Sequence, residues 1–286
     1  MRLLFGIPGF LLLLSLVVTR AGAADYPQRI VSLGPINTEN VYLLGAEDRL
    51  VADTSYCVRP AAAREKQKIG SVMQISIEKI ISLRPDLVLA TGLTQPQQVQ
   101  KLQDLGLRVV RFEQPDSFTA ICTQFVQLGR LLGLEDRAQQ IVAQARNRVQ
   151  QIEQQVAPLP VQKVFLQVGA QPLFGSVPSS FTHEYIILAG GINVLDDQAT
   201  GTTNYEKILT KNPDVIIIAV MGTESGVAIR EKEKWSSFGS IKAVRNNRVF
   251  LINPDLVCSP SPITFSRTLA RIAHLMHPEL GMEADL

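Results

Sequence analysis

The sequence predicts an α/β protein of two similar lobes with mainly parallel sheets, joined by one long rigid α-helix. Three observations lead to this fold class. Residues 76–90 and 204–218 repeat one pattern of residue types, and short apolar runs alternate with helical patterns in both halves. Between the halves, residues 135–156 form one long amphipathic stretch. Strands that alternate with helices indicate parallel sheets whose faces are covered by helices.

The repeat places equivalent residues at equal offsets in the two halves. Residues 78–80 and 206–208 both read Glu-Lys-Ile, and residues 85–86 and 213–214 both read Pro-Asp. Each copy therefore contains a polar cap, a short helix, Pro-Asp and a buried strand. Two lobes of similar architecture imply a cleft between them, and clefts of this kind bind ligands.

The remaining elements follow from apolar periodicity and from the turn residues that bound each run. In the first half we expect strands at 29–33, 50–53, 87–90 and 109–112, and helices at 37–44, 76–84 and 98–105. In the second half we expect strands at 161–168, 215–220 and 248–252, and helices at 181–188, 204–211, 241–244 and 266–276.

The middle of the chain differs from both halves. Its apolar residues within 135–156 are three or four apart, which places them on one stripe of a helix. A helix of this length is about 33 Å long, more than a crossover inside one sheet requires. We interpret it as a rigid strut between lobes; an ordinary long surface helix is the alternative. The expected division is a signal peptide at 1–23, an N-terminal lobe at 24–133, a bridging helix at 134–157 and a C-terminal lobe at 158–286.

The first 23 residues have the pattern of a secretory signal: Arg2, an apolar stretch, and small residues at 21–23. A retained membrane anchor is the alternative, although the apolar run is short for a span. Cleavage would remove Arg2 and Arg20 and leave 26 basic residues against 26 acidic ones. A neutral chain argues against nucleic acid or an anionic membrane surface as the main partner. We expect a periplasmic monomer.

Nothing in the sequence forms a recognisable catalytic set, so we do not expect an enzyme. The nucleophile elbow, the phosphate-binding loop and the dinucleotide fingerprint are all absent. The three cysteines allow several states. Cys122 lies in a helical pattern and is expected in the core. Cys57 and Cys258 lie in loops, where they could form a disulfide, hold a soft metal or remain unconnected thiols.

The repeat gives each lobe one glutamate in a first helical turn, Glu78 after Ser76 and Glu206 after Asn204. A carboxylate at a helix N-terminus is stabilising by about 0.3–1 kcal/mol, which is a sufficient local reason for either one. Two such residues at matched positions instead suggest a shared external task. Two exposed anions on separate lobes suit a two-fold symmetric partner with basic pockets.

The chain resembles the periplasmic substrate-binding proteins of ABC importers for cobalamin, ferric siderophores and haem. The resemblance covers nearly all of the chain after residue 23, and the order and spacing of its motifs make it specific. The matching segments are 29–33, 56–60, 69–71, 77–88, 189–193, 206–214 and 243–249.

This resemblance implies two lobes joined by one long helix, with the ligand in the cleft. It also implies that Glu78 and Glu206 dock onto arginines of a dimeric ABC permease that works with its ATPase. Loops at the carboxyl ends of parallel strands are where such folds place ligands. On that rule the expected ligand contacts are Pro35, Asn37, Tyr56, Cys57, Arg59, Phe174, Phe181, Trp235 and Cys258. The four aromatic residues among them could stack on a flat macrocycle or pack within a lobe.

One departure from the family pattern bears on the ligand. Many relatives carry an arginine after the second proline near residues 259–260, where this chain has Ile263. Arg59 could take over an arginine contact to an anionic siderophore. The loop at Tyr56 and Cys57 is closest to cobalamin-type members, which favours a corrinoid or another metal chelate as ligand and requires no resident cofactor. The alternatives are an exported enzyme and a protein that binds a bare metal ion through His183, Cys57, Cys258 or Met221.

Overall fold

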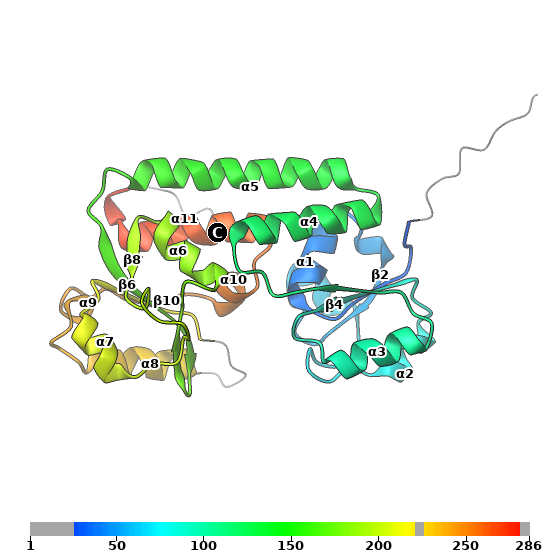
Figure 1. Ribbon diagram of the computed structural model, residues 1–286, viewed down its shortest axis with the longest axis horizontal. Helices are drawn as coiled ribbons and strands as arrows, with labels where there is room; N and C mark the ends of the chain where they lie inside the picture. Colours follow the sequence, from blue (N-terminus) through cyan, green and yellow to red (C-terminus); the bar gives the residue numbers. More distant parts are fainter. Residues whose placement is uncertain (1–25, 221–225, 281–286) are drawn as a thin grey trace, which may run out of the picture.

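The computed structural model describes residues 26–220 and 226–280. The expected signal peptide at 1–23, the loop residues Met221 and Gly222, and the tail from Gly281 lie outside the described residues. The described chain forms two α/β lobes side by side under one long helix (Figure 1). The predicted fold class is therefore confirmed. No helix among residues 26–220 and 226–280 has the length and apolar character needed to cross a membrane.

The N-terminal lobe is built on one parallel sheet with strand order β3-β2-β1-β4-β5. Its strands are β1 (Ile30–Ser32), β2 (Leu50–Asp53), β3 (Gln67–Lys68), β4 (Leu87–Thr91) and β5 (Val109–Phe112). Its helices are α1 (Pro35–Leu43), α2 (Ile77–Ser82), α3 (Pro96–Asp104) and α4 (Phe118–Leu132), with 3-10 turns at Glu47–Arg49 and Ala61–Glu65.

Alternate residues of the central strands face two different cores, as the period of two in a strand requires. Leu87 and Leu89 of β4 pack with α1 and α4, whereas Val88 and Ala90 pack with α2 and α3. Helices therefore cover both faces of the sheet, α1 and α4 on one side and α2 and α3 on the other (Figure 1).

The C-terminal lobe repeats this plan with strand order β10-β9-β6-β7, and β8 pairs with the first part of β6. Its strands are β6 (Gln162–Ala170), β7 (Leu173–Gly175), β8 (Gly191–Asn193), β9 (Val215–Ile218) and β10 (Val249–Leu251). Its helices are α6 (Phe181–Leu188), α7 (Tyr205–Lys211), α8 (Val227–Ser236), α9 (Lys242–Arg245), α10 (Pro254–Cys258) and α11 (Pro262–Met276), followed by a 3-10 turn at Pro278–Leu280.

The aspartate of the repeated Pro-Asp pair makes equivalent hydrogen bonds in both lobes. The Asp86 carboxylate accepts hydrogen bonds from the backbone of residues 28 and 29, and the Asp214 carboxylate accepts one from the backbone of Lys163. Each aspartate thereby joins the start of its own strand to the start of the neighbouring central strand. The residue before each proline is left-handed, with φ of 46° at Arg84 and 49° at Asn212.

Three elements differ from the sequence-based expectation. Residues 173–175 form β7, which pairs antiparallel with the end of β6, where a loop was expected. Helices α8 and α10 were not expected at all, because residues 227–236 are rich in charge and residues 254–258 are short and follow a proline. The closing helix begins at Pro262 rather than at residue 266.

The bridge is α5 (Glu135–Val156), with the bounds that its apolar stripe predicts. It does not stand alone, because α4 of the N-terminal half and α11 of the C-terminal lobe lie against it (Figure 1). The buried stripe of α5 consists of Ala138, Val142, Ala145, Val149, Ile152 and Val156. These side chains share one core cluster with both lobes. The bridge is therefore a layer of three helices that belongs to both lobes.

The turn from α4 to α5 depends on a close approach at Gly129. A Cβ atom added to Gly129 would lie 2.5 Å from the Ala138 Cβ. Gly129→Ala should therefore lower the free energy of unfolding by about 1–3 kcal/mol through overpacking, although alanine is the better helix former. Chemical denaturation measures the change. Gly239→Ala is the matched control, because an added Cβ there meets no atom within 4 Å. Equal midpoints for the two variants would contradict the close approach.

Candidate functional site

The lobes meet through a polar contact centred on Arg59, which follows β2. Its Nη1 donates to the backbone oxygen of Asp255 at 2.6 Å, and its Nη2 donates to that of Ser259 at 2.5 Å. Nη2 also lies 2.8 Å from a carboxylate oxygen of Glu39 on α1. Because Asp255 and Ser259 follow β10, the loops at the carboxyl ends of β2 and β10 face each other across the two lobes.

Glu39 completes this contact from the N-terminal lobe. It is 7% exposed, and its Oε1 accepts hydrogen bonds from the hydroxyls of Ser261, at 2.7 Å, and of Thr264. Ser261 caps the N-terminus of α11, where the helix dipole favours a carboxylate. We call Glu39, Arg59, Ser261 and Thr264 the lobe latch. The structure thus gives Arg59 a different role from the expected ligand contact, since both of its terminal nitrogens bind the other lobe.

A stack of three aromatic rings crosses the same junction. Phe118 of α4 stacks on Phe265 of α11 with ring centroids 4.6 Å apart, and Phe265 stacks on Tyr185 of α6 at 4.4 Å. Phe181 packs edge-on against Tyr185 and is 2% exposed. Phe181 was expected to stack on a ligand, and the structure places its ring in the core at the junction.

Trp235, which was also expected to contact a ligand, lies inside the C-terminal lobe. It is fully buried, packs against Phe165 and donates from Nε1 to Gln167 Oε1 at 2.7 Å. Gln167 in turn donates to Glu231 at 2.7 Å, and the Tyr205 hydroxyl donates to the same carboxylate at 2.6 Å. Burial, together with this hydrogen bond to Glu231, raises the pKa of Tyr205. The network fastens α8 to the central strand β6.

A pocket of about 510 Å³ lies between the β6–β7 hairpin and α8. Its lining residues are Gly169, Ala170, Gln171, Pro172, Phe174, Val220, Val227, Arg230 and Glu231. Phe174 is 39% exposed and its ring rests on the loop before α7, since a Cβ at Gly201 would lie 2.4 Å from that ring. Phe174, which the sequence predicted as a ligand contact, therefore lines a pocket of this lobe.

The N-terminal lobe presents exposed apolar side chains at one edge of its sheet. Tyr56 follows β2, Met73 follows β3 and Leu93 follows β4, and they are 46%, 53% and 58% exposed. The carboxyl ends of parallel strands lie at the same edge, so the three segments that carry these side chains lie along one edge of the sheet. We call them the apolar edge. Of the three, Tyr56 was expected to bind ligand.

Pro35 and Asn37, two expected ligand contacts at the start of α1, differ in their burial. Pro35 is the first residue of α1 and is half-buried. Asn37 is 3% exposed and donates from Nδ2 to the backbone oxygen of Ala90 at 3.1 Å. The amide of Asn37, an expected ligand contact, instead joins α1 to β4 inside the lobe.

The three cysteines are all free thiols. Cys57 is fully buried, and its sulfur accepts a hydrogen bond from the Thr38 hydroxyl at 3.2 Å. Cys258 is half-buried, and burial together with the charge of Asp255 raises the pKa of its thiol to about 12. The structure therefore supports unconnected thiols, and burial withdraws Cys57 from a ligand in the cleft.

No three His, Cys, Asp or Glu side chains gather into a metal-holding group within residues 26–220 and 226–280. His183, which the bare-metal hypothesis uses, has Nδ1 3.1 Å from the Asn193 amide nitrogen, and burial lowers the pKa of its imidazole. That imidazole is therefore tied to the end of β8.

The paired glutamates lie where the repeat predicts. Glu78 and Glu206 are exposed in the first turns of α2 and α7. The Ser76 hydroxyl caps α2 by accepting from the Lys79 backbone at 3.3 Å, and the Asn204 side chain caps α7 in the same way at 2.8 Å. Both helices lie on the side of the molecule away from α5 (Figure 1). The two carboxylates therefore come from one side of the molecule.

Sequence reasoning missed Met73, the hairpin residues 171–172 and Arg230. The hairpin had a usable signal, because Gln-Pro between two apolar runs is typical of a turn. Met73 had none, because the strand before it contains only two residues. Arg230 lies on α8, which has no clear apolar period.

A model of the periplasmic binding protein family matches residues 30–256, which span both lobes and the bridge. The chain belongs to the periplasmic binding protein family. One relative in this family is an ABC transporter substrate-binding lipoprotein of Bacillus subtilis, 31% identical over 245 residues, or 82% of this chain and 76% of that protein. The vitamin B12-binding protein of Yersinia pseudotuberculosis is 32% identical over 229 residues, or 78% of this chain and 80% of that protein.

A solved structure shows the same fold. The periplasmic vitamin B12 binding protein of Vibrio cholerae has a TM-score of 0.75 with this chain at 26% sequence identity, covering 90% of this chain and 99% of that one. The resemblance read from the sequence is confirmed at the level of the family. Membership in this family assigns the chain to substrate binding for transport, and the family and its lipoprotein member indicate a location outside the cytoplasm.

The lobe latch should contribute measurably to stability. Glu39→Gln keeps the side-chain shape but removes the charge that Arg59 contacts, so the free energy of unfolding should fall by about 1.5–3 kcal/mol, the usual value of a hydrogen bond to a charged group. Urea denaturation measures it. Glu65→Gln, at an exposed position, is the control and should change stability by less than about 0.5 kcal/mol. Equal losses in both variants would contradict the latch.

Cys258 should resist alkylation in the folded protein. With its pKa raised to about 12, its thiolate fraction at pH 8 is about one in ten thousand, against about a quarter for an ordinary thiol. Iodoacetamide at pH 8, followed by mass spectrometry, should therefore modify Cys258 about two thousand times more slowly than free cysteine. Unfolding in guanidinium should restore the ordinary rate. Rapid labelling of the folded chain would show that the thiol is not buried as described.

Proposed function

We propose that this chain captures a metal chelate between its lobes and delivers it to an ABC permease that works with its ATPase. The observation that carries the proposal is the apolar edge of one lobe together with Phe174 of the other. These large apolar side chains remain exposed at strand ends, where α/β folds place ligands. The latch supports the cleft, because it joins loops at the carboxyl ends of the two sheets.

A chelate suits this surface better than a bare ion does. Tyr56 and Phe174 offer aromatic faces to a flat macrocycle, and Met73 is a side chain that adapts to irregular ligand shapes. A bare divalent ion would instead require clustered nitrogen, sulfur or carboxylate ligands. The relatives named for vitamin B12 support a corrinoid as the first candidate, with haem and ferric siderophores as the others.

Delivery rests on Glu78 and Glu206. Each carboxylate is exposed on a short helix of its own lobe, and the two helices lie on one side of the molecule (Figure 1). A permease dimer with a basic pocket on each subunit would meet one glutamate per lobe, so one monomer spans the two-fold axis. We also propose that residues 1–23 are removed as a signal peptide on export and that the mature chain works in the periplasm.

Ligand binding should depend on the aromatic side chains at the two strand edges. Tyr56→Ala and Phe174→Ala should each weaken the affinity for the chelate by about tenfold. A stacked aromatic contact contributes about 0.5–1.5 kcal/mol of binding free energy beyond that of the area it buries. Isothermal titration of cyanocobalamin, haemin and a ferric hydroxamate identifies the ligand and measures the change. Tyr26→Ala is the control, since Tyr26 is 41% exposed beside the α4–α5 turn. An unchanged affinity in both cleft variants would refute the proposed site.

Transport should fail when the two glutamates are reversed. Glu78→Lys combined with Glu206→Lys should abolish uptake of the chelate, since like charges would then face a basic pocket. Affinity for the free chelate should stay within about twofold, because neither residue lies in the cleft. Uptake in cells that lack the wild-type receptor measures the first effect, and titration measures the second.

The control for this experiment is Glu65→Lys combined with Glu153→Lys. Both residues are exposed glutamates outside α2 and α7, and the double change alters the net charge by the same amount. This variant should transport normally. Normal transport by the double reversal at residues 78 and 206 would overturn the docking role while leaving the binding proposal intact.

A further inference from the structure

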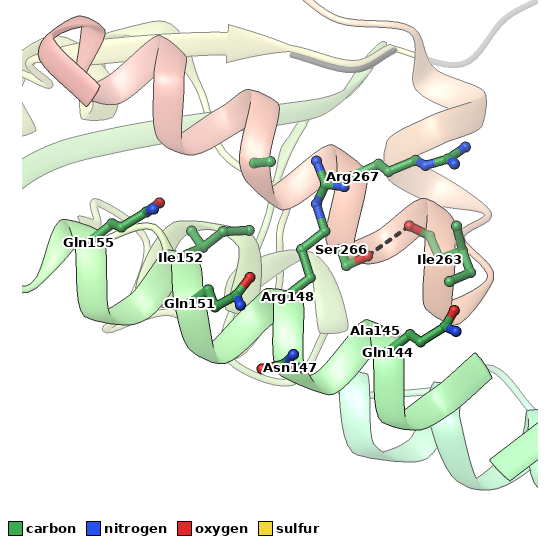
Figure 2. A pocket seen from close by; sticks show the side chains of 11 residues that line it. Gln144, Ala145, Asn147, Arg148, Gln151, Ile152, Gln155, Ile263, Ser266 and Arg267 are labelled. Atoms are coloured by element: carbon green, nitrogen blue, oxygen red, sulfur yellow. Dashed lines mark hydrogen bonds between the residues drawn. The ribbon is translucent and has the colours of Figure 1, made fainter. Parts of the chain in front are cut away.

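A hollow lies between α5 and α11 on the bridge, away from Phe174 and the apolar edge. It has a volume of about 560 Å³. Figure 2 shows its lining side chains, which come from the two facing helices. They are Gln144, Ala145, Asn147, Arg148, Gln151, Ile152 and Gln155 of α5, and Ile263, Ser266, Arg267 and Ala270 of α11. We call this hollow the bridge groove.

The bridge groove carries positive charge without a carboxylate among its lining residues. Arg148 and Arg267 contribute one guanidinium each, from opposite walls. Within residues 26–220 and 226–280, neither makes a hydrogen bond or an ion pair. Arg130 at the other end of the bridge differs, because it pairs with Glu135 at 2.7 Å. Helix α11 contains no acidic residue that could neutralise the groove.

The wall formed by α5 is a regular polar stripe. Gln144, Arg148, Gln151 and Gln155 are spaced by three or four residues, so they share one face of the helix. The side-chain amides of the three glutamines have no hydrogen-bond partner within the described part of the chain. Arg148 is half-buried and reaches from α5 toward α11 (Figure 2). A set of free donors therefore surrounds a concave, positively charged space.

We propose that the bridge groove binds a free tetrahedral oxyanion of the phosphate or sulfate class. A guanidinium offers a planar fork of N–H donors that matches such an anion, and charge-assisted hydrogen bonds of this kind are strong. The glutamine amides supply further N–H donors. An anion between Arg148 and Arg267 also offsets the repulsion between their like charges. The bridge lies opposite α2 and α7 (Figure 1), so the groove stays open when those helices face a permease.

The test is calorimetric titration of the full folded chain with inorganic phosphate at pH 7.5. Sodium chloride holds the ionic strength constant, and chloride alone is the blank. We expect saturable binding to one site. Arg148→Gln and Arg267→Gln should each weaken it by about tenfold, as expected for the loss of a charged hydrogen bond. Circular dichroism confirms that each variant is folded, and Arg267 is exposed, so its replacement leaves the core intact.

The matched control is Arg146→Gln. Arg146 is on the same helix and loses the same charge, but it lines a different pocket, beside α4. Its affinity for phosphate should stay within about twofold of wild type. Non-saturable heats in the wild type at millimolar phosphate would overturn the proposal, and so would an equal loss in the control. Titration of the chelate into the same variants should show unchanged affinity, which separates this site from the cleft.

A lipid headgroup carries the same phosphate chemistry, so the experiment needs a second arm. Co-sedimentation with phosphatidylglycerol vesicles, against phosphatidylcholine vesicles, distinguishes a membrane surface from a free anion. We expect equal, low sedimentation with both. Arginine-dependent sedimentation with phosphatidylglycerol and no saturable binding of inorganic phosphate would overturn the assignment to a free oxyanion.

Discussion

The apolar stripe of α5 buries against α4 and α11, and this packing holds the two sheets in a defined relation. Each lobe contributes one of the two packed helices, so neither lobe can move relative to the other without exposing part of a shared core. Gly129 lets α4 and α5 approach closely where the chain turns between them. The loops at the carboxyl ends of both sheets are positioned by this layer, because the strands that carry them are fixed beneath it.

Polar and aromatic contacts at the junction further restrict how the two lobes can shift relative to each other. The buried Glu39 carboxylate accepts hydrogen bonds from Ser261 and Thr264 of the other lobe and faces Arg59, which itself reaches across. Burying a charge is unfavourable unless it is paired and hydrogen-bonded, so the latch tolerates little displacement. The stacked rings of Phe118, Phe265 and Tyr185 limit sliding in the same place. A receptor built this way holds its two lobes in one defined orientation.

The sequence predicts the architecture more successfully than the binding surface. The repeat, the bounds of α5 and both capped glutamates follow from local rules about helix starts and apolar spacing, and they are found where expected. Trp235, Phe181 and Asn37 were expected at the cleft because their segments look like loops or begin helices. They are buried instead, since Trp235 lies on the unexpected helix α8 and faces β6, and α6 and α1 turn the other two inward. A side chain's direction depends on elements that pack against it from distant parts of the chain.

By itself the sequence determined two α/β lobes, the strut between them and one exposed acid per lobe, because periodicity, caps and turn residues act over a few neighbouring positions. Only the tertiary structure decided that Arg59 binds the opposite lobe, that Met73 and Leu93 join Tyr56 on one edge, and that α11 completes the bridge. Those facts depend on contacts between residues as far apart as 59 and 259, and no local pattern records which distant segments will meet.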